Sequence, residues 1–160
     1  MSKPPQWIVR VDDRLVHGQV VIGWGRPLGA TRIILVDDQV AASDWEQELY
    51  RMGVPPELEL EFLPLAAVSG NAPGWAADPR PAILLTGDVA TMAAVCRAAG
   101  PVGQVNLGGL HHKPGRTERL PYIFLSEDDY HVLQALAADG TRVTAQDLPT
   151  SAPVALEALR

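Results

Sequence analysis

Residues 7–20 read WIVRVDDRLVHGQV, and the character of the sequence changes twice within this stretch. Residues 7–11 form a short apolar run rich in β-branched side chains, which is typical of a buried strand. Two acids and an arginine follow, and from Gly18 an apolar segment indicates the start of a helix. A strand that leads through a polar loop into a helix begins a β–α–β unit. This order favours an α/β fold.

The same alternation continues along the chain. Segments with helical period separate short apolar runs; one of them carries Trp45, Leu49 and Met52 at spacings of i, i+4 and i+7. Another begins after Ser126, which can cap a helix with an acidic first turn, and ends at Gly140. The predicted strands are residues 7–11, 33–36, 58–63, 83–85, 105–107, 122–125 and 142–145.

These elements predict one domain over residues 1–160. We expect an open α/β fold with a single, mostly parallel central sheet of about seven strands and helices on both faces. Strict acid/apolar alternation from Glu57 predicts a strand near a sheet edge with one face in solvent. The Gly-, Pro- and Ala-rich residues 69–81 predict a loop, and residues 111–121 a turn between two strands.

Composition narrows the class of protein. The 160 residues are 47% hydrophobic and 20% charged, enough apolar material for one core. A formal net charge of −6 argues against a nucleic-acid partner or an anionic membrane surface. No apolar run approaches the roughly 18 residues of a membrane span, and two prolines stand where a signal peptide needs an apolar run. We therefore expect a soluble cytoplasmic protein without membrane insertion.

Several kinds of site are not expected. Cys96 is the only cysteine, so the chain has no internal disulfide and no cysteine-cluster metal site. The adjacent His111 and His112 would point apart, and we expect neither a metal nor a cofactor. The glycines around Trp24 lack dinucleotide-binding spacing. Trp24 itself, on the first helix, is expected to contact a partner.

The loop after the first strand is the candidate site. Ligands of open parallel sheets bind beyond the carboxyl ends of the strands, and there a neutral imidazole, His17, is a competent nucleophile. Arg14 offers a planar fork that matches a phosphate. The alternative is a solvated turn in which His17 only caps the helix. The candidate residues are His17 as nucleophile, Arg14 for phosphoryl charge, Asp13 to orient the loop or His17, and Gly18, Gln19, Thr86, Gly108 and Gly109 for phosphate binding.

A family resemblance adds to this interpretation. The stretch VRVDDRLVHGQVVIGW, residues 9–24, resembles the phosphorylation-site signature of the enzyme IIB component of the mannose, fructose and sorbose family of the bacterial sugar phosphotransferase system (PTS). Residues 32–43, 105–115 and 122–149 are also similar to that family, so the likeness covers nearly the whole chain. The histidine before Gly-Gln, which is phosphorylated in the family, falls on His17, and the arginine of the loop falls on Arg14.

The resemblance implies a phosphotransferase. Members take a phosphoryl group from a phosphohistidine of a IIA protein and pass it to a sugar bound by the membrane subunits IIC and IID. The protein is expected to be cytoplasmic and peripheral to that permease, at the inner face of the membrane. The alternative is a regulatory phosphoryl-binding module of the same fold that serves no transporter. The sequence names no sugar and does not decide whether the chain forms a homo-oligomer.

Overall fold

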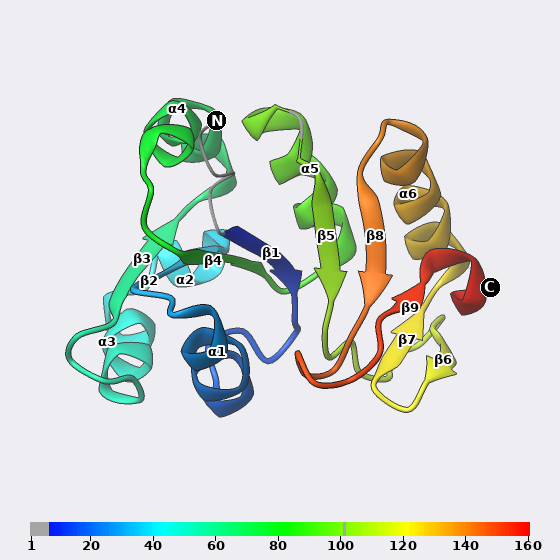
Figure 1. Cartoon of the computed structure of the whole chain (residues 1–160), viewed down its shortest axis with the longest axis horizontal. Coiled ribbons are helices and arrows are strands. Elements are labelled where there is room, and N and C mark those ends of the chain that lie inside the picture. The colour runs from blue at the N-terminus through cyan, green and yellow to red at the C-terminus, as the bar shows by residue number, and fades with distance from the viewer. Residues whose placement is uncertain (1–6, 101) are drawn as a thin grey trace.

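The computed structural model describes residues 7–100 and 102–160, and its centre is a seven-stranded sheet in the order β3-β2-β4-β1-β5-β8-β9 (Figure 1). All neighbouring pairs are parallel except β8 and β9. The expected fold class is confirmed. The strands of this sheet are β1 (Trp7–Val11), β2 (Arg32–Val36), β3 (Glu59–Leu63), β4 (Ala82–Thr86), β5 (Gln104–Leu107), β8 (Arg142–Ala145) and β9 (Val154–Ala155).

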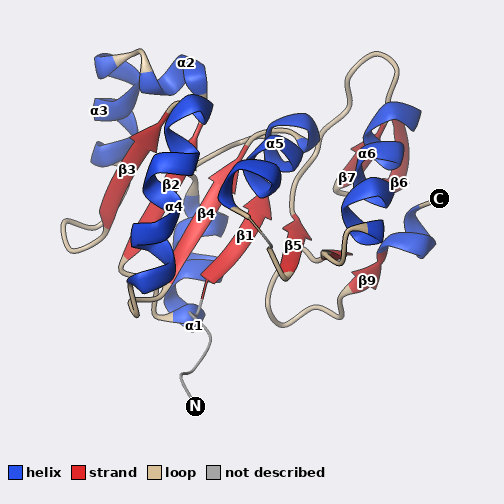
Figure 2. Cartoon of the chain, turned by 90° about the horizontal axis from the view of Figure 1, so that it is seen from above, coloured by secondary structure: helices blue, strands red, loops and turns tan. Residues whose placement is uncertain are grey.

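Helices cover both faces because the buried strands are apolar on both sides. Ile33 and Leu35 of β2 face one core cluster and Ile34 and Val36 the other. Figure 2 shows α4, α5 and α6 on the near side of the sheet and α1 behind it. The helical segments are η1 (Gln19–Gly25), α1 (Arg26–Leu28), α2 (Asp38–Ala41), α3 (Asp44–Met52), η2 (Leu65–Ala67), α4 (Val68–Ala77), α5 (Val89–Ala99), α6 (Glu127–Ala138) and η3 (Leu156–Leu159).

Two local predictions are confirmed. β3 lies at the edge of the sheet, as the acid/apolar alternation predicts. α6 begins with a capping box in which the Ser126 side chain accepts a hydrogen bond from Asp129 N–H, and the Asp129 carboxylate accepts one from Ser126 N–H. Gly140, just beyond α6, adopts a φ of 99° that disfavours other residues.

Three predictions need correction. Residues 69–81 are not a loop, since most of them form α4, where burial of Val68 and Trp75 outweighs the glycines and Pro73. Residues 111–121 are not only a turn, because β6 (Thr117–Leu120) pairs with β7 (Ile123–Leu125) in a separate antiparallel sheet. The predicted strand 122–125 therefore contributes β7 to this hairpin, and β9 is the seventh strand of the central sheet.

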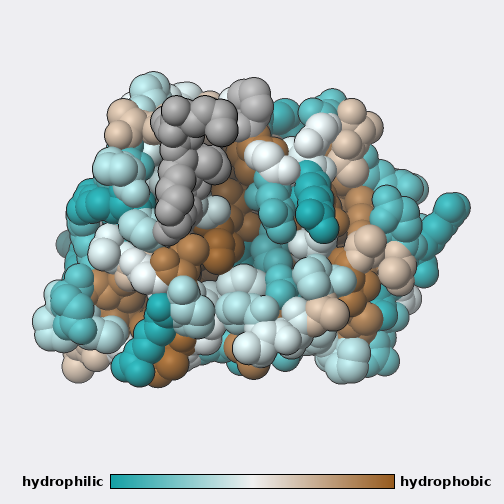
Figure 3. Space-filling model, viewed as in Figure 1, coloured by the Kyte–Doolittle hydropathy of each residue, from teal (hydrophilic) through white to brown (hydrophobic). Residues whose placement is uncertain are grey.

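The apolar stripe of α3 faces away from the core. The helix is confirmed, but Trp45, Leu49 and Met52 are 68%, 52% and 76% exposed, and Tyr50 packs against the core instead. On the face drawn in Figure 3, apolar residues form separate patches between hydrophilic ones. Among the described residues, none of the helices combines the length and the apolar character that crossing a bilayer requires.

The connections diverge at the centre of the sheet. The chain leaves β1 into η1, whose buried residues belong to one core cluster, and leaves β4 into α5, whose buried residues belong to the other. Because β1 and β4 are neighbours, these two helical segments separate to opposite faces there. A point of this kind, at the carboxyl ends of neighbouring strands, is where open α/β sheets bind ligands. The loop 12–18 lies at this point.

Candidate functional site

The loop 12–18 is fixed to both strands that flank β1. Asp12 N–H donates to Thr86 O at 2.9 Å, and Asp13 N–H donates to Gly109 O at 2.8 Å. Leu15 has a φ of 60°, a left-handed conformation that costs on the order of 1 kcal/mol for a side chain of this kind. Gly87 makes room for it, because a β-carbon there would lie 2.8 Å from Leu15 Cδ2. The surrounding structure thus holds the loop in a strained shape that presents His17.

The two ring nitrogens of His17 have different environments. Nε2 is inaccessible to solvent and lies 3.0 Å from Asp12 Oδ2. Nδ1 accepts a hydrogen bond from Gln19 N–H at 3.3 Å. Nε2 faces the negative charge of Asp12, whereas Nδ1 faces the N–H of Gln19, so this arrangement favours the proton on Nε2 and the lone pair on Nδ1. Of the two ring nitrogens, Nδ1 is therefore the one with the lone pair that a nucleophile needs.

Asp12 is the carboxylate that orients His17. Its side chain is fully buried. Burial by itself raises the pKa of this carboxyl, but the contact with His17, the Arg14 N–H and the charge of Arg10 together hold the pKa below its ordinary value. Asp12 is therefore an anion at neutral pH and places a negative charge beside the imidazole of His17.

Arg10 supports this site from inside the sheet. Its side chain is fully buried, donates to Asn106 Oδ1 and, at 3.0 Å, to Gln146 O, and lies 3.9 Å from Asp12 Oδ2. Burial lowers the pKa of Arg10 to about 10, with partial compensation by Asp12, so the group stays charged at neutral pH. Cζ of Arg10 lies 4.5 Å from the centroid of the Trp24 ring, and Trp24 is only 5% exposed. The prediction that Trp24 contacts a partner is wrong, because the ring belongs to the core.

Gly108 and Gly109 do not offer free amides to a ligand. Both residues are buried; Gly108 N–H donates to Val11 O, and Gly109 N–H donates to Asp12 Oδ2. Gly108 is needed for another reason, since a β-carbon there would lie 2.6 Å from Cζ of Arg10. Thr86 is likewise occupied: it is fully buried and its hydroxyl donates to Asp88 O. These three residues therefore support the loop 12–18 from the buried side.

We expect Gly108→Ala to destabilise the protein. The added methyl group must displace a buried, hydrogen-bonded guanidinium, which costs about 1–3 kcal/mol of unfolding free energy. Urea unfolding of both proteins measures the difference. Gly70→Ala is the matched control, because a β-carbon at Gly70 meets no atom within 4 Å. Equal stability of Gly108→Ala and the wild type would contradict the tight packing of Arg10 against Gly108.

Asp13 binds His111 rather than His17. Its two oxygens accept from His111 N–H at 2.7 Å and contact His111 Nδ1 at 2.6 Å. Of the two roles predicted for Asp13, orienting the loop is the one that these contacts support. They also place His111 beside the site, which the sequence did not indicate. The described residues contain no group of three or more His, Cys, Asp or Glu side chains that could hold a metal ion.

Arg14 and Gln19 lie at the rim of the site. The Arg14 side chain is 48% exposed, and its Nη2 donates to Gln19 Oε1 at 2.8 Å. Gly18, also exposed, precedes the helical segment at whose amino end His17 lies. The helix dipole there favours an anion.

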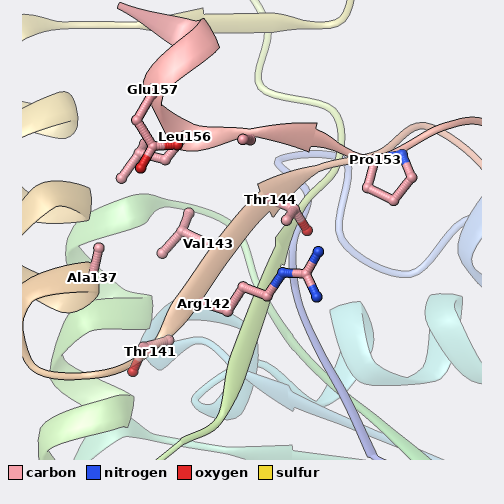
Figure 4. Close-up of a pocket in the computed structure, with 9 residues that line it drawn as sticks. Ala137, Thr141, Arg142, Val143, Thr144, Pro153, Leu156 and Glu157 are labelled. Atoms are coloured by element: carbon pink, nitrogen blue, oxygen red, sulfur yellow. The ribbon is translucent and has the colours of Figure 1, made fainter.

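A cavity of about 240 Å³ lies elsewhere, between α6, β8 and β9 (Figure 4), and no residue of the loop 12–18 lines it.

The sequence did not indicate that Arg10 belongs to the site, or that Asp12 and not Asp13 contacts His17. Arg10 interrupts an apolar strand, and a charge in a buried strand needs partners, so this signal was present. The partners themselves, Asn106 and residues 146–147, come from distant parts of the chain and have no local signal.

Comparisons with known proteins point to one family. A family model described as PTS system sorbose subfamily IIB component matches residues 7–159. N-acetylgalactosamine-specific phosphotransferase enzyme IIB component 1 of Escherichia coli K12 is 29% identical over 152 residues, which cover 93% of this chain and 94% of that protein. The sorbose-specific EIIB component of Lacticaseibacillus casei is 28% identical over 138 residues, with 85% and 83% covered.

A solved structure shows the same fold. The crystal structure of the N-acetylgalactosamine-specific IIB component 1 from Escherichia coli superposes with a TM-score of 0.84 at 26% sequence identity, over 92% of this chain and 96% of that one. The fold expected from the resemblance is thereby confirmed.

Proposed function

This chain belongs to the sorbose-subfamily IIB components of the phosphotransferase system, and from that premise we propose that His17 accepts a phosphoryl group from a phosphorylated IIA protein. The group then passes to a sugar bound by the IIC and IID subunits of a membrane permease. Residues 1–160 act as one IIB domain in this proposal. The protein works in the cytoplasm, docked on the permease at the inner face of the membrane.

The observation that carries the proposal is the pair formed by His17 and Asp12. Nδ1 attacks the phosphorus, an N–P bond forms, and the P–N bond to the IIA histidine breaks. The proton stays on Nε2 throughout, and Nε2 lies 3.0 Å from Asp12 Oδ2. The imidazole therefore gains positive charge next to a buried carboxylate, which stabilises the phosphorylated ring.

Residues at the rim supply the positive charge for the phosphoryl oxygens. Arg14 is exposed and has a planar fork of donors. When Nδ1 is phosphorylated, Gln19 N–H loses its present acceptor and becomes free to donate to a phosphoryl oxygen. Gly18 adds the amino end of the helical segment. In the onward step the sugar oxygen takes the phosphoryl group and the N–P bond breaks.

Membranes that contain matching IIC and IID subunits test the whole proposal. Phosphorylated protein should lose its phosphoryl group to a sugar only when these membranes and the correct sugar are present. If the phosphorylated protein stays intact with every permease and sugar of the source organism, transport is contradicted. The regulatory role of the same site would then replace it.

We expect Arg14→Lys to slow transfer from phospho-IIA by about tenfold or more. A lysine keeps the charge but lacks the fork, and tenfold corresponds to about 1.4 kcal/mol of lost transition-state stabilisation. Because Arg14 is exposed, the melting temperature should stay close to that of the wild type. Rapid-quench kinetics with radiolabelled phospho-IIA measures the rate, and Arg26→Lys, an exposed arginine of α1, is the control. Equal rates for wild type and Arg14→Lys would remove Arg14 from the mechanism.

A further inference from the structure

The side chain of Gln19 joins two distant parts of the site. Its Nε2 donates to Asp147 Oδ1 at 2.8 Å, and its Oε1 accepts from Arg14 Nη2, also at 2.8 Å. Asp147 follows β8, far along the chain from the loop 12–18. One amide group therefore connects a carboxylate of the C-terminal region with the arginine beside His17.

The chemistry of the two end groups fixes which way the amide points. A carboxylate has only acceptors and a guanidinium has only donors, so the NH₂ of Gln19 must face Asp147 and its oxygen must face Arg14. The reverse orientation would put two acceptors together at Asp147 and two donors together at Arg14. The charge on Asp147 thus selects the orientation in which Gln19 can hold Arg14.

The backbone of Asp147 is held independently of its side chain. Its carbonyl oxygen accepts from Trp24 Nε1 at 2.9 Å and from Arg10 Nη2 at 3.2 Å. The next residue, Leu148, packs so closely on Gly23 that a β-carbon at Gly23 would lie 2.8 Å from Leu148 Cδ2. A change of the Asp147 side chain therefore leaves these contacts in place and removes the carboxylate, whose charge also raises the pKa of the neighbouring Arg10.

We propose that Asp147 is a positioning residue for phosphoryl transfer, which acts through Gln19 to hold the Arg14 guanidinium beside His17. The inference rests on the proposed function, since it assigns Arg14 a role toward the phosphoryl group. The Arg14 side chain is half exposed, and in the described part of the chain its one hydrogen bond is the bond to Gln19, beside a longer ion pair from its Nε to Asp12 Oδ1 at 3.7 Å. Without Asp147 the Gln19 amide is free to turn, and Arg14 keeps only the ion pair of its Nε with Asp12, which does not fix the position of its Nη2 before the transfer step.

A double-mutant cycle between Asp147 and Arg14 tests the inference. In the wild-type background, Asp147→Ala should lower kcat for transfer from phospho-IIA by about tenfold and leave KM for phospho-IIA unchanged. In the Arg14→Ala background the same change should have no further effect. Gln19→Ala should reproduce the loss, and Asp147→Asn, whose amide can either donate or accept, should lie between Asp147→Ala and the wild type.

Asp128→Ala is the control for net charge. Asp128 is an exposed acid in the first turn of α6, and its removal should leave kcat unchanged. The ¹⁵N order parameter of the Arg14 Nε–H gives a second readout, which does not need a partner protein and should fall in Asp147→Ala. Melting temperatures should agree within a few degrees.

The outcomes separate the inference from the proposed function. If Asp147→Ala slows transfer equally with and without Arg14, or leaves the Arg14 order parameter unchanged, the positioning role is overturned while phosphorylation of His17 stands. If wild-type protein accepts no phosphoryl group at all, the proposed function fails. The order parameter then still decides whether Asp147 orients Arg14.

Discussion

Replacing His17 by alanine should abolish phosphorylation by phospho-IIA, with a loss of at least about a thousandfold because the nucleophile itself is removed. In the structure, His17 lies in the loop between the diverging helical segments, where its Nδ1 accepts from Gln19 N–H and its Nε2 lies 3.0 Å from the buried carboxylate of Asp12. Incubation with radiolabelled phospho-IIA, followed by gel separation at alkaline pH, measures the label. The base stability of a phosphohistidine allows this separation.

The other histidines serve as controls. His131→Ala changes an exposed residue of α6 and should retain full labelling. His111→Ala removes the partner of Asp13 beside the loop, so it should retain labelling at the same site, although its rate can differ. Full labelling of His17→Ala, or loss of labelling only in a variant of another histidine, would refute the assignment.

Replacing Asp12 by asparagine should lower the transfer rate by on the order of a hundredfold to ten-thousandfold. An asparagine amide can donate to Nε2, which would move the imidazole proton to Nδ1 and remove the nucleophilic lone pair. The variant also lacks the negative charge that balances the phosphorylated ring. Two measurements check this: the rate of labelling, and ¹⁵N chemical shifts of the imidazole, which report the tautomer.

Either measurement, the labelling rate or the ¹⁵N shifts, can contradict the role of Asp12. A wild-type rate in Asp12→Asn, or an unchanged tautomer with the proton on Nε2, would show that Asp12 does not orient His17. The matched control is Asp13→Asn, because Asp13 contacts His111 and not His17. Its effect on the tautomer of His17 should be nil.

The pH dependence of stability gives Asp12 an independent signature. Its pKa in the folded protein lies below the ordinary value of 3.8, so its ionised form contributes stability above about pH 4. That contribution is lost as the pH falls through the folded-state pKa. Asp12→Asn should therefore lose less stability than the wild type between neutral pH and this acid range.

The sequence predicts those features of the fold that depend on local pattern. Alternating strands and helices establish the parallel sheet, and acid/apolar alternation places β3 at its edge. The same pattern gives the wrong answer where packing outweighs local preference. Residues 69–81 are rich in glycine and proline, yet burial of Val68 and Trp75 makes most of them helical.

The site is predicted only in part, for a related reason. Spacing identifies His17, Arg14 and a nearby carboxylate, but it cannot decide between two adjacent acids. Asp12 follows directly on β1 and turns inward to Arg10, whereas Asp13 turns to His111. The residues that decide this, and Asp147 as well, join the site only through the three-dimensional arrangement of β1, β5 and β8.

The most direct test of phosphoryl transfer through His17 is to map the phosphoryl group in the wild-type protein. Protein labelled uniformly with ¹⁵N is phosphorylated by phospho-IIA, and NMR correlation of ¹⁵N with ³¹P, together with mass spectrometry of base-stable peptides, identifies the modified atom. The account predicts one phosphoryl group per chain, on Nδ1 of His17, with the proton retained on Nε2. A phosphoryl group on His111, His112, His131 or a residue other than histidine would contradict it.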